Sequence, residues 1–232
     1  MLEAIDLSTA YVDFDADCML FHDLPQEDLN RLAEMSRLRM ICPNQSLSDQ
    51  NSPSGRVFNI VSGSGVVERI SSSGRRQILA FVFPGDFVGL SNSAYFEYGI
   101  RSLTNVSAYE FPRSRLVELS EASPVLKANI QSIRDRVLAL TFDQVFLLGQ
   151  RRAHERLCFF LLHMLERLPG ARAERIQLPM CRQDIGDFLG LTPETVSRSL
   201  AKLKRDGLIA SPTPQTICIR DMERVQELAD IS

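Results

Sequence analysis

Three polar side chains near the C-terminus have the chemistry and the spacing to read the edges of DNA bases. They are Glu194, Ser197 and Arg198, in the segment "TPETVSRSLAKLKR". Arginine can donate two hydrogen bonds to guanine O6 and N7, glutamate can accept one from cytosine N4, and serine can contact thymine or a phosphate. Glu194 and Arg198 are also one helical turn apart, so the alternative is a surface ion pair that contributes little. The surrounding segment favours the first interpretation.

That segment predicts a helix-turn-helix followed by a β-hairpin. Gly190 supplies the turn, Thr192 is a favourable N-cap, and Pro193 suits the first position of the second helix. The inward-facing apolar residues would be Ile185, Phe188 and Leu189 on the first helix and Val196, Leu200 and Leu203 on the second. The short strand "IQLPM" precedes the helices, and "LIASPTPQTICIR" after them has a β-turn-β pattern. This order is typical of a winged helix, whose second helix reaches base edges through residues near its N-terminus.

The charge of the chain is distributed unevenly. From residue 151 onward there are 13 Lys and Arg against 11 Asp and Glu, whereas the first 150 residues hold 13 against 18. The formal charge of -3 therefore combines an acidic N-terminal part with a mildly basic C-terminal part, which suits a nucleic-acid binder with local positive charge. No apolar run approaches the ~20 residues of a spanning helix and no signal peptide is evident, so we expect a cytoplasmic protein without membrane contact. The five scattered cysteines suggest reduced thiols.

The N-terminal part predicts a β domain. Residues 25–38 have helical spacing of apolar residues, and residues 56–90 then alternate short β-rich runs with turns at Ser62-Gly63, Ser73-Gly74 and Pro84-Gly85. A further strand-like run covers 101–111. Several short strands at this spacing predict a small antiparallel roll or jelly roll.

From Pro124 the apolar period becomes helical. Seven positions follow alternating steps of four and three: Leu126, Ile130, Ile133, Val137, Leu140, Gln144 and Leu147. This a/d pattern over about three heptads is typical of a two-stranded parallel coiled coil, in which the polar Gln144 could fix the register. The alternative is an amphipathic helix that faces its own core. Because the next segment, "ERLCFFLLHMLERL", is apolar enough to build its own core, we favour a dimer seam.

These patterns predict an α+β fold with three parts. They are a β-roll at 1–122, a dimerisation helix at 123–150 and a winged helix-turn-helix domain at 151–232. No P-loop, metal-spaced His/Cys cluster or nucleophile elbow is present, so we expect no enzyme activity.

Two motifs give the chain a resemblance to a known family. "PGDFVGL" at 84–90 and "DIGDFLGLTPETVSRSLAKLKRDGLI" at 184–209 resemble the cyclic-AMP receptor/FNR (CRP/FNR) family of bacterial transcription regulators. The likeness covers about 20–225, and the E-x-x-S-R pattern of Glu194, Ser197 and Arg198 is similar to that of the FNR and FixK branch. The receptor branch has Gly where Ser197 stands. With "LPMCRQDIGDFLGLT", the chain is most similar to FixK-type regulators.

The resemblance implies a function and a set of partners. FixK-type proteins are homodimeric activators of microaerobic, nitrogen-fixation and denitrification genes, and the likeness implies a TTGAT-N4-ATCAA palindrome and contact with RNA polymerase. It places Pro193 with the base-contacting residues, although family members often have Val or Leu there. Phosphate contacts are expected from Arg182, Gln183, Thr192, Lys202 and Lys204. The loops at 71–76 and 168–175 are the candidate polymerase contacts.

The known signals of the family fit this chain poorly, so we expect no cofactor. Only Cys18 and Cys42 precede residue 158, and an iron–sulfur cluster normally needs four thiolates. Gly89 is followed by Leu90 rather than by the Glu of nucleotide-binding relatives, and Gly99-Ile100 stands where their Arg-Ser pair would be. Arg101 lies close by, which keeps a receptor-type regulator gated by a cyclic nucleotide or another small molecule as the alternative.

The histidines and cysteines give one further hypothesis. His22, His154 and His163 show no ligand spacing for heme or a metal, and Cys158 and Cys218 fit apolar core patterns. Cys181 stands at the expected N-cap of the first motif helix beside Arg182, a setting that favours the oxidisable thiolate. In the family fold, Arg182 and Gln183 lie against the DNA backbone, so an oxidised Cys181 would repel phosphate. The alternative is an inert cysteine at a cap position.

Overall fold

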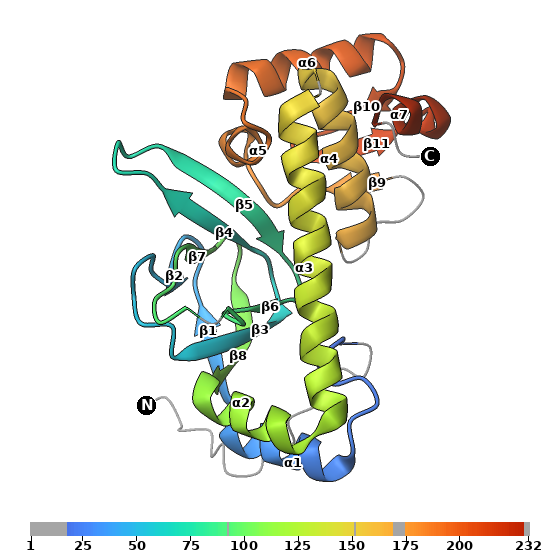
Figure 1. The fold of residues 1–232 in the computed structure, drawn as a ribbon. Helices are drawn as coiled ribbons and strands as arrows, with labels where there is room; N and C mark the ends of the chain where they lie inside the picture. The colour runs from blue at the N-terminus through green and yellow to red at the C-terminus, as the bar shows by residue number, and fades with distance from the viewer. Residues whose placement is uncertain (1–17, 92, 151, 169–174, 230–232) are drawn as a thin grey trace, which may run out of the picture.

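The computed structural model describes residues 18–91, 93–150, 152–168 and 175–229. They form an N-terminal β-roll, one long helix and a C-terminal helical domain (Figure 1). The long helix, α3 (Pro124–Gln150), runs along the roll and ends beside the C-terminal domain. This is the predicted α+β architecture.

The roll consists of two four-stranded antiparallel sheets. One sheet has the order β1-β8-β3-β6 and contains β1 (Arg37–Ile41), β3 (Arg56–Ser62), β6 (Phe87–Val88) and β8 (Val106–Pro112). The other has the order β2-β7-β4-β5 and contains β2 (Ser46–Ser48), β4 (Gly65–Ile70), β5 (Arg76–Val82) and β7 (Gly99–Ser102). Gly85 supplies the predicted turn after β5 with a φ of 89°, which favours glycine.

The helix expected over 25–38 is shorter than predicted. Helix α1 (Gln26–Met35) ends before Ser36, and Leu38 lies in β1, where it pairs with Tyr109 of β8. The prediction was wrong beyond Met35 because pairing with a strand 71 residues away outweighs a continuing local apolar period. Helix α1 buries Leu32 beneath the roll, next to α2 (Arg113–Ala122).

Most of the predicted dimer seam faces the protomer's own core. Leu126, Ile130 and Ile133 are buried with α1 and α2, and Leu147 is buried in the C-terminal core. Gln144 is half-buried, and its amide donates to the backbone oxygens of Ile78 at 3.3 Å and Phe188 at 3.5 Å. The prediction that the four buried residues line the seam was wrong, because each is covered within one protomer. Leu140 is half-buried, and of the seven only Val137 is exposed.

Helix α3 has a second apolar face, which points to solvent. Leu138, Phe142 and Val145 lie at helical spacing and are 53%, 64% and 64% exposed. When a helix has two apolar faces, its sequence shows two sets of apolar residues at helical spacing. The pattern does not indicate which of the two faces packs against the rest of the same chain. Here the a/d face is covered and the other face is open.

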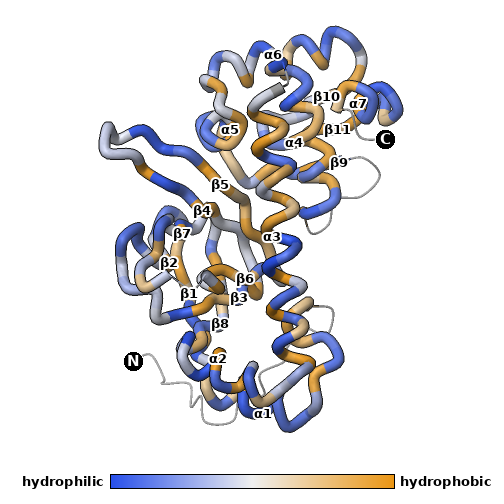
Figure 2. Tube along the Cα trace, in the orientation of Figure 1, coloured by the Kyte–Doolittle hydropathy of each residue, from blue (hydrophilic) through white to orange (hydrophobic). Residues whose placement is uncertain are grey.

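The C-terminal domain is built around α4 (Ala153–Arg167), and the middle of this helix is mostly apolar (Figure 2). Around α4 lie α5 (Arg182–Leu189), α6 (Pro193–Arg205) and α7 (Met222–Ala229). A three-stranded sheet in the order β10-β11-β9 completes the domain, with β9 (Arg175–Gln177), β10 (Ile209–Ala210) and β11 (Thr216–Ile219). None of the helices in the described part of the chain has the length and apolarity to cross a membrane.

The roll and the C-terminal domain share one apolar core. Phe81 of β5 lies 5.9 Å from Phe160 of α4 and 5.1 Å from Phe188 of α5, measured between ring centroids. Arg167 at the end of α4 binds the Asp86 carboxylate of the roll and lies over the Phe83 ring. Strand β5 therefore packs against α5, the first helix of the helix-turn-helix (Figure 1).

Candidate nucleic-acid interface

The turn between α5 and α6 depends on two glycines. Gly190 adopts the left-handed conformation with a φ of 65°, as the sequence predicts for the turn residue. Gly186 lets α5 approach the turn, because a Cβ there would lie 2.6 Å from the Leu191 oxygen. The Leu191 N–H donates to the Gly186 oxygen at 2.9 Å, which fixes the angle at which the chain enters α6.

Helix α6 begins as predicted. The Thr192 hydroxyl oxygen accepts the backbone N–H of Thr195 at 3.2 Å, and Pro193 occupies the first turn. The inner face buries Val196, Leu200 and Leu203. The outer surface of α6 is mostly hydrophilic (Figure 2). Glu194, Ser197 and Arg198 are exposed there, and Pro193 is half-buried beside them.

Local contacts hold the three exposed side chains and leave some of their donors and acceptors able to bind a partner on the outer side of α6. The Ser197 hydroxyl donates to the Pro193 oxygen at 2.9 Å, so its lone pairs can still accept. Arg198 donates one N–H to Thr195 Oγ1 at 3.2 Å, which leaves four donors. The pKa of Glu194 is lowered first by its own backbone N–H and then by the Thr192 hydroxyl, with Arg198 adding less. Arg198 therefore contributes least to the lowered pKa of Glu194.

Thr195 is a residue that sequence reasoning missed. It lies one residue after Glu194, its hydroxyl is 3.1 Å from Thr192 Oγ1, and it holds the Arg198 guanidinium. The signal was its i,i+3 spacing to both Thr192 and Arg198 on the outer side of α6.

The start of α5 places three further predicted residues together. Cys181 is the exposed N-cap, and Asp184 Oδ2 accepts its backbone N–H at 3.1 Å and its thiol at 3.0 Å. Gln183 is exposed and donates to Asp187 Oδ1 at 2.6 Å. Arg182 donates to the Pro214 oxygen at 2.7 Å and is thereby held against the wing.

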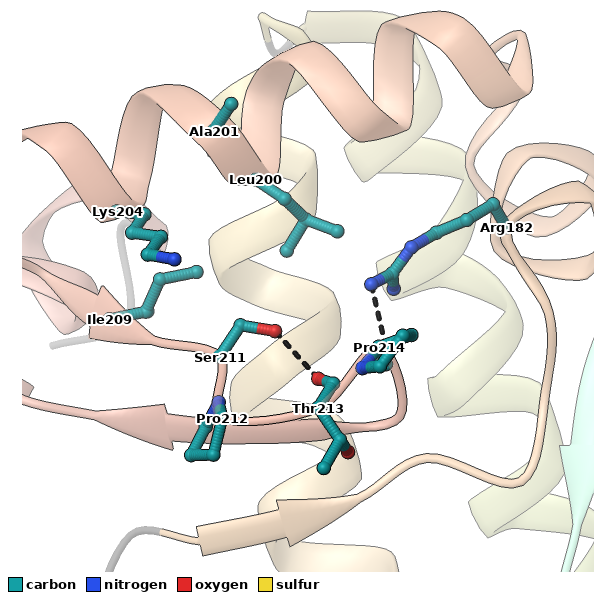
Figure 3. A pocket seen from close by; sticks show the side chains of 9 residues that line it. All are labelled: Arg182, Leu200, Ala201, Lys204, Ile209, Ser211, Pro212, Thr213 and Pro214. Carbon is teal, nitrogen blue, oxygen red and sulfur yellow. Dashed lines mark hydrogen bonds between the residues drawn. The ribbon is translucent and has the colours of Figure 1, made fainter.

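A pocket of about 390 Å³ lies between α6 and the wing (Figure 3). Arg182 and Lys204 line it from two elements, with Ser211 and Thr213 contributed by the wing. The Ser211 hydroxyl donates to the Thr213 oxygen at 2.8 Å. Two cations with hydroxyls and an open mouth are suited to a backbone phosphate. Lys202 lies outside this lining, and its ammonium pairs with Asp206 at 2.6 Å.

A second cavity, of about 560 Å³, lies between the roll and α3. Its lining includes the turn 85–91 and three arginines, Arg134, Arg136 and Arg167. Arg134 donates to the Leu90 oxygen at 3.0 Å. Arg101 is not part of this lining, because Glu68 binds its guanidinium at 3.1 Å and Asn44 accepts from it at 3.2 Å. The Arg101 guanidinium is thus directed to Glu68 and Asn44 and not to this cavity.

The remaining thiols and histidines differ in their burial. Burial raises the pKa of Cys158 to about 12, whereas Cys218 is only half-buried, so the core prediction holds fully for Cys158 alone. Burial, helped by Arg167 and Arg136, lowers the pKa of His163 to about 4. Within the described ranges, no group of three or more His, Cys, Asp or Glu is arranged to hold a metal ion.

Comparison with known proteins agrees with this geometry. Residues 155–228 match the Crp-like helix-turn-helix domain, and residues 38–123 match the cyclic nucleotide-binding domain. The transcriptional activatory protein AadR of Rhodopseudomonas palustris is 35% identical over 88% of this chain and 84% of its own length. The chain belongs to the CRP/FNR family. It is therefore a DNA-binding transcription regulator.

Within the CRP/FNR family, the similarity is to FixK-type proteins. The nitrogen fixation regulation protein FixK of Bradyrhizobium diazoefficiens is 31% identical over 93% of this chain and 94% of its own length. The structure of FixK2 from Bradyrhizobium japonicum superposes with a TM-score of 0.79, at 31% identity, over 83% of this chain and 96% of that one. The family assignment agrees with the exposed helix α6 and with the sensor-like roll beneath it.

Proposed function

We propose that this regulator is a homodimeric activator of genes expressed under oxygen limitation, including nitrogen-fixation genes, and that it binds a TTGAT-N4-ATCAA palindrome. The observation that carries the proposal is the exposed set of Glu194, Ser197 and Arg198 at the start of a capped α6. The names of the relatives AadR and FixK support the activating role. Such a protein works in the cytoplasm, where promoter DNA is accessible.

Base and phosphate contacts have separate sources in this proposal. Glu194, Ser197 and Arg198 read base edges, with Pro193 beside them. Backbone phosphates are held by Arg182 and Lys204 at the wing pocket and by Gln183 and Thr192 at the starts of the two helices, with Lys202 adding charge.

The dimer contact is the open face of α3. Leu138, Phe142 and Val145 form an apolar stripe at i, i+4 and i+7, which is the spacing of a helix–helix contact. Two-fold pairing of two copies through this stripe would give the symmetric pair of α6 helices that a palindrome with half-sites about one helical turn apart requires.

Cys181 is the proposed redox control of DNA binding. Its thiol is exposed and lies at the start of α5, next to the phosphate candidates Arg182 and Gln183. A sulfinate or sulfonate would add negative charge both toward DNA and toward Asp184, which now accepts from the thiol. Peroxide should therefore weaken DNA binding by the natural protein, whereas Cys181→Ser should resist it. Equal peroxide sensitivity of the two proteins contradicts this role.

Contact with RNA polymerase is proposed for the β4–β5 turn, where residues 71–75 are exposed. The second candidate, the loop 168–175, lies mostly outside the described residues.

A second candidate function is gating by a small anionic ligand. The 560 Å³ cavity favours it, because Arg134 and Arg136 in its lining can hold a negatively charged group, whereas Arg167 there is bound to Asp86. It predicts DNA binding only after addition of the ligand.

The test is fluorescence anisotropy on a labelled palindrome under reducing conditions, with excess nonspecific DNA. Tight specific binding without added ligand supports the first proposal. Binding that appears only with cyclic AMP favours the second, and no specific binding under either condition rejects both.

A further inference from the structure

A cluster of charged side chains joins the β-roll to the first helix of the DNA-binding motif. Arg76, at the start of β5, donates from Nη2 to Asp184 Oδ1 at 2.5 Å and from Nε to Asp187 Oδ2 at 2.6 Å. The two carboxylates lie on α5, more than 100 residues further along the chain. The side chains of Arg76, Asp184 and Asp187 are 24%, 10% and 12% exposed, so water screens this contact less than a surface pair.

A second arginine completes the cluster from the roll. Arg101 binds Glu68 at 3.1 Å, and its guanidinium lies 3.7 Å from Asp184. Glu68 also pairs with Arg76 at 3.4 Å. Two arginines therefore face three carboxylates, and Arg76 is the residue that contacts all three.

Backbone contacts extend the same junction. The amide of Gln77 donates to the backbone oxygen of Asp187, and the amide of Gln144 on α3 donates to those of Ile78 and Phe188. The Phe81, Phe160 and Phe188 rings lie behind these bonds. The charged cluster thus forms the polar rim of an apolar contact, an arrangement that restricts the relative motion of domains.

The carboxylates that bind Arg76 also hold the DNA-facing end of α5. Asp184 accepts from the backbone N–H and thiol of Cys181, and Asp187 accepts from Gln183. Burial by itself would raise the pKa of Asp184, but hydrogen bonds from Cys181 and Arg76 outweigh it and lower that pKa. Asp184 is therefore charged at neutral pH. Without Arg76, two like charges one turn apart would repel each other and any nearby DNA phosphate.

We propose that Arg76, a residue of the sensor-like roll, is a positioning residue for DNA binding that holds α5, and with it α6, in the orientation seen here through Asp184 and Asp187. The exposed face of α6 takes no part in this contact, the lock, so the lock and the DNA are bound by different faces of the motif. This inference rests on the proposed function, and it explains how a chain without a bound effector keeps its helix-turn-helix fixed. It also identifies the contact through which a change in the roll would reach the DNA.

The test compares three single variants of the full-length protein. Arg76→Gln should weaken binding to the palindrome by about tenfold, within the range typical of coupling between separate sites. Arg75→Gln removes the same charge from an exposed residue of the same hairpin and should change affinity by less than about twofold. Arg76→Lys keeps the charge but cannot form the fork to two carboxylates, so we expect an intermediate loss.

A double-mutant cycle separates positioning from a general loss of stability. Asp187→Asn removes one of the two carboxylates that Arg76→Gln would leave unpaired. In that background Arg76→Gln should therefore reduce DNA affinity clearly less than it does alone. Additive losses, or equal effects of Arg76→Gln and Arg75→Gln, overturn the proposal.

Hydrogen exchange of the protein without DNA tests the contact between Arg76 and α5 independently of the DNA-binding measurements. Arg76→Gln should raise exchange of the α5 amides, and Arg75→Gln should not. If Arg76→Gln does not fold, Arg76→Lys carries both measurements. A natural protein that does not bind the palindrome rejects the proposed function, whereas unchanged α5 exchange in the Arg76 variants rejects the lock.

Discussion

Replacing Phe142 by glutamate should separate the dimer. Phe142 is 64% exposed on the open face of α3. An aromatic side chain buries about 150–250 Å² in a core, so about 100–160 Å² of Phe142 remains for a partner helix. Symmetry doubles this area, and at about 25 cal/mol per Å² its complete burial would contribute at most about 5–8 kcal/mol. A helix–helix contact covers about half of such a side chain, which leaves roughly 3 kcal/mol.

A loss of about 3 kcal/mol raises the dimer dissociation constant by more than about a hundredfold, and a charge placed in the contact adds to it. Sedimentation equilibrium measures the dissociation constant directly. Anisotropy should then show weaker binding to the palindrome and unchanged binding to a single half-site, because the DNA-reading face is intact.

The matched control is Val117→Glu, which places the same charge at an apolar residue of α2 that is 45% exposed. It should leave the dimer unchanged. A Phe142→Glu protein that sediments as a dimer at the same concentration as the natural protein refutes the assignment of this face.

Three further predictions concern the DNA contacts and the fold. Arg198→Ala should reduce the free energy of binding to the palindrome by about 1–3 kcal/mol and relax specificity at one base pair. Lys204→Ala should weaken binding to all DNA sequences alike and lower the slope of log affinity against log salt by about 1. Anisotropy across salt concentrations measures both. Thr192→Ala should lower the free energy of unfolding by about 1 kcal/mol through loss of the α6 cap, as checked by urea unfolding; a change below about 0.3 kcal/mol contradicts the cap. Burial lowers the pKa of His163 from 6.5 in the unfolded chain to about 4 in the folded protein. Protonation therefore favours the unfolded chain, and the free energy of unfolding should fall as pH falls between these values. The loss is up to about 3 kcal/mol, and His163→Gln should flatten the pH profile, whereas an unchanged profile rejects this assignment.

The helix-turn-helix was predictable because its signals are local. Gly190, Thr192 and Pro193 each have a conformational role that can be recognised from residue type alone, and the structure shows the left-handed turn and the cap. Gly186 was not identified, because its role is a close approach to Leu191 that only the folded turn creates.

The face of α3 that is left open to solvent was not predictable in the same way. The a/d pattern found a real apolar stripe, but α1, α2 and the C-terminal core cover most of it within one chain. Phe142 and Val145 were present in the same segment, and periodicity ranks the two stripes without showing which one the roll occupies. The alternative of a core-facing helix was correct for Leu126, Ile130 and Ile133.

The partners of Arg76 and Arg101 were equally hidden, since pairs separated by 108 and 33 residues leave no local pattern. Yet these pairs change the functional argument. The sequence suggested Arg101 as a ligand contact because it lies close to the positions of the Arg-Ser pair in nucleotide-binding relatives. In the structure Arg101 belongs to the charged cluster that holds α5. Its guanidinium is held by Glu68 and Asn44, and Arg101 is not among the residues that line the α3 cavity. An anionic ligand in the α3 cavity would therefore have to use Arg134 or Arg136, because Arg167 is already bound to Asp86. Both arginines lie on α3, the helix that also carries the open apolar face, so such a ligand would contact the proposed dimer helix rather than the charged cluster at Arg76.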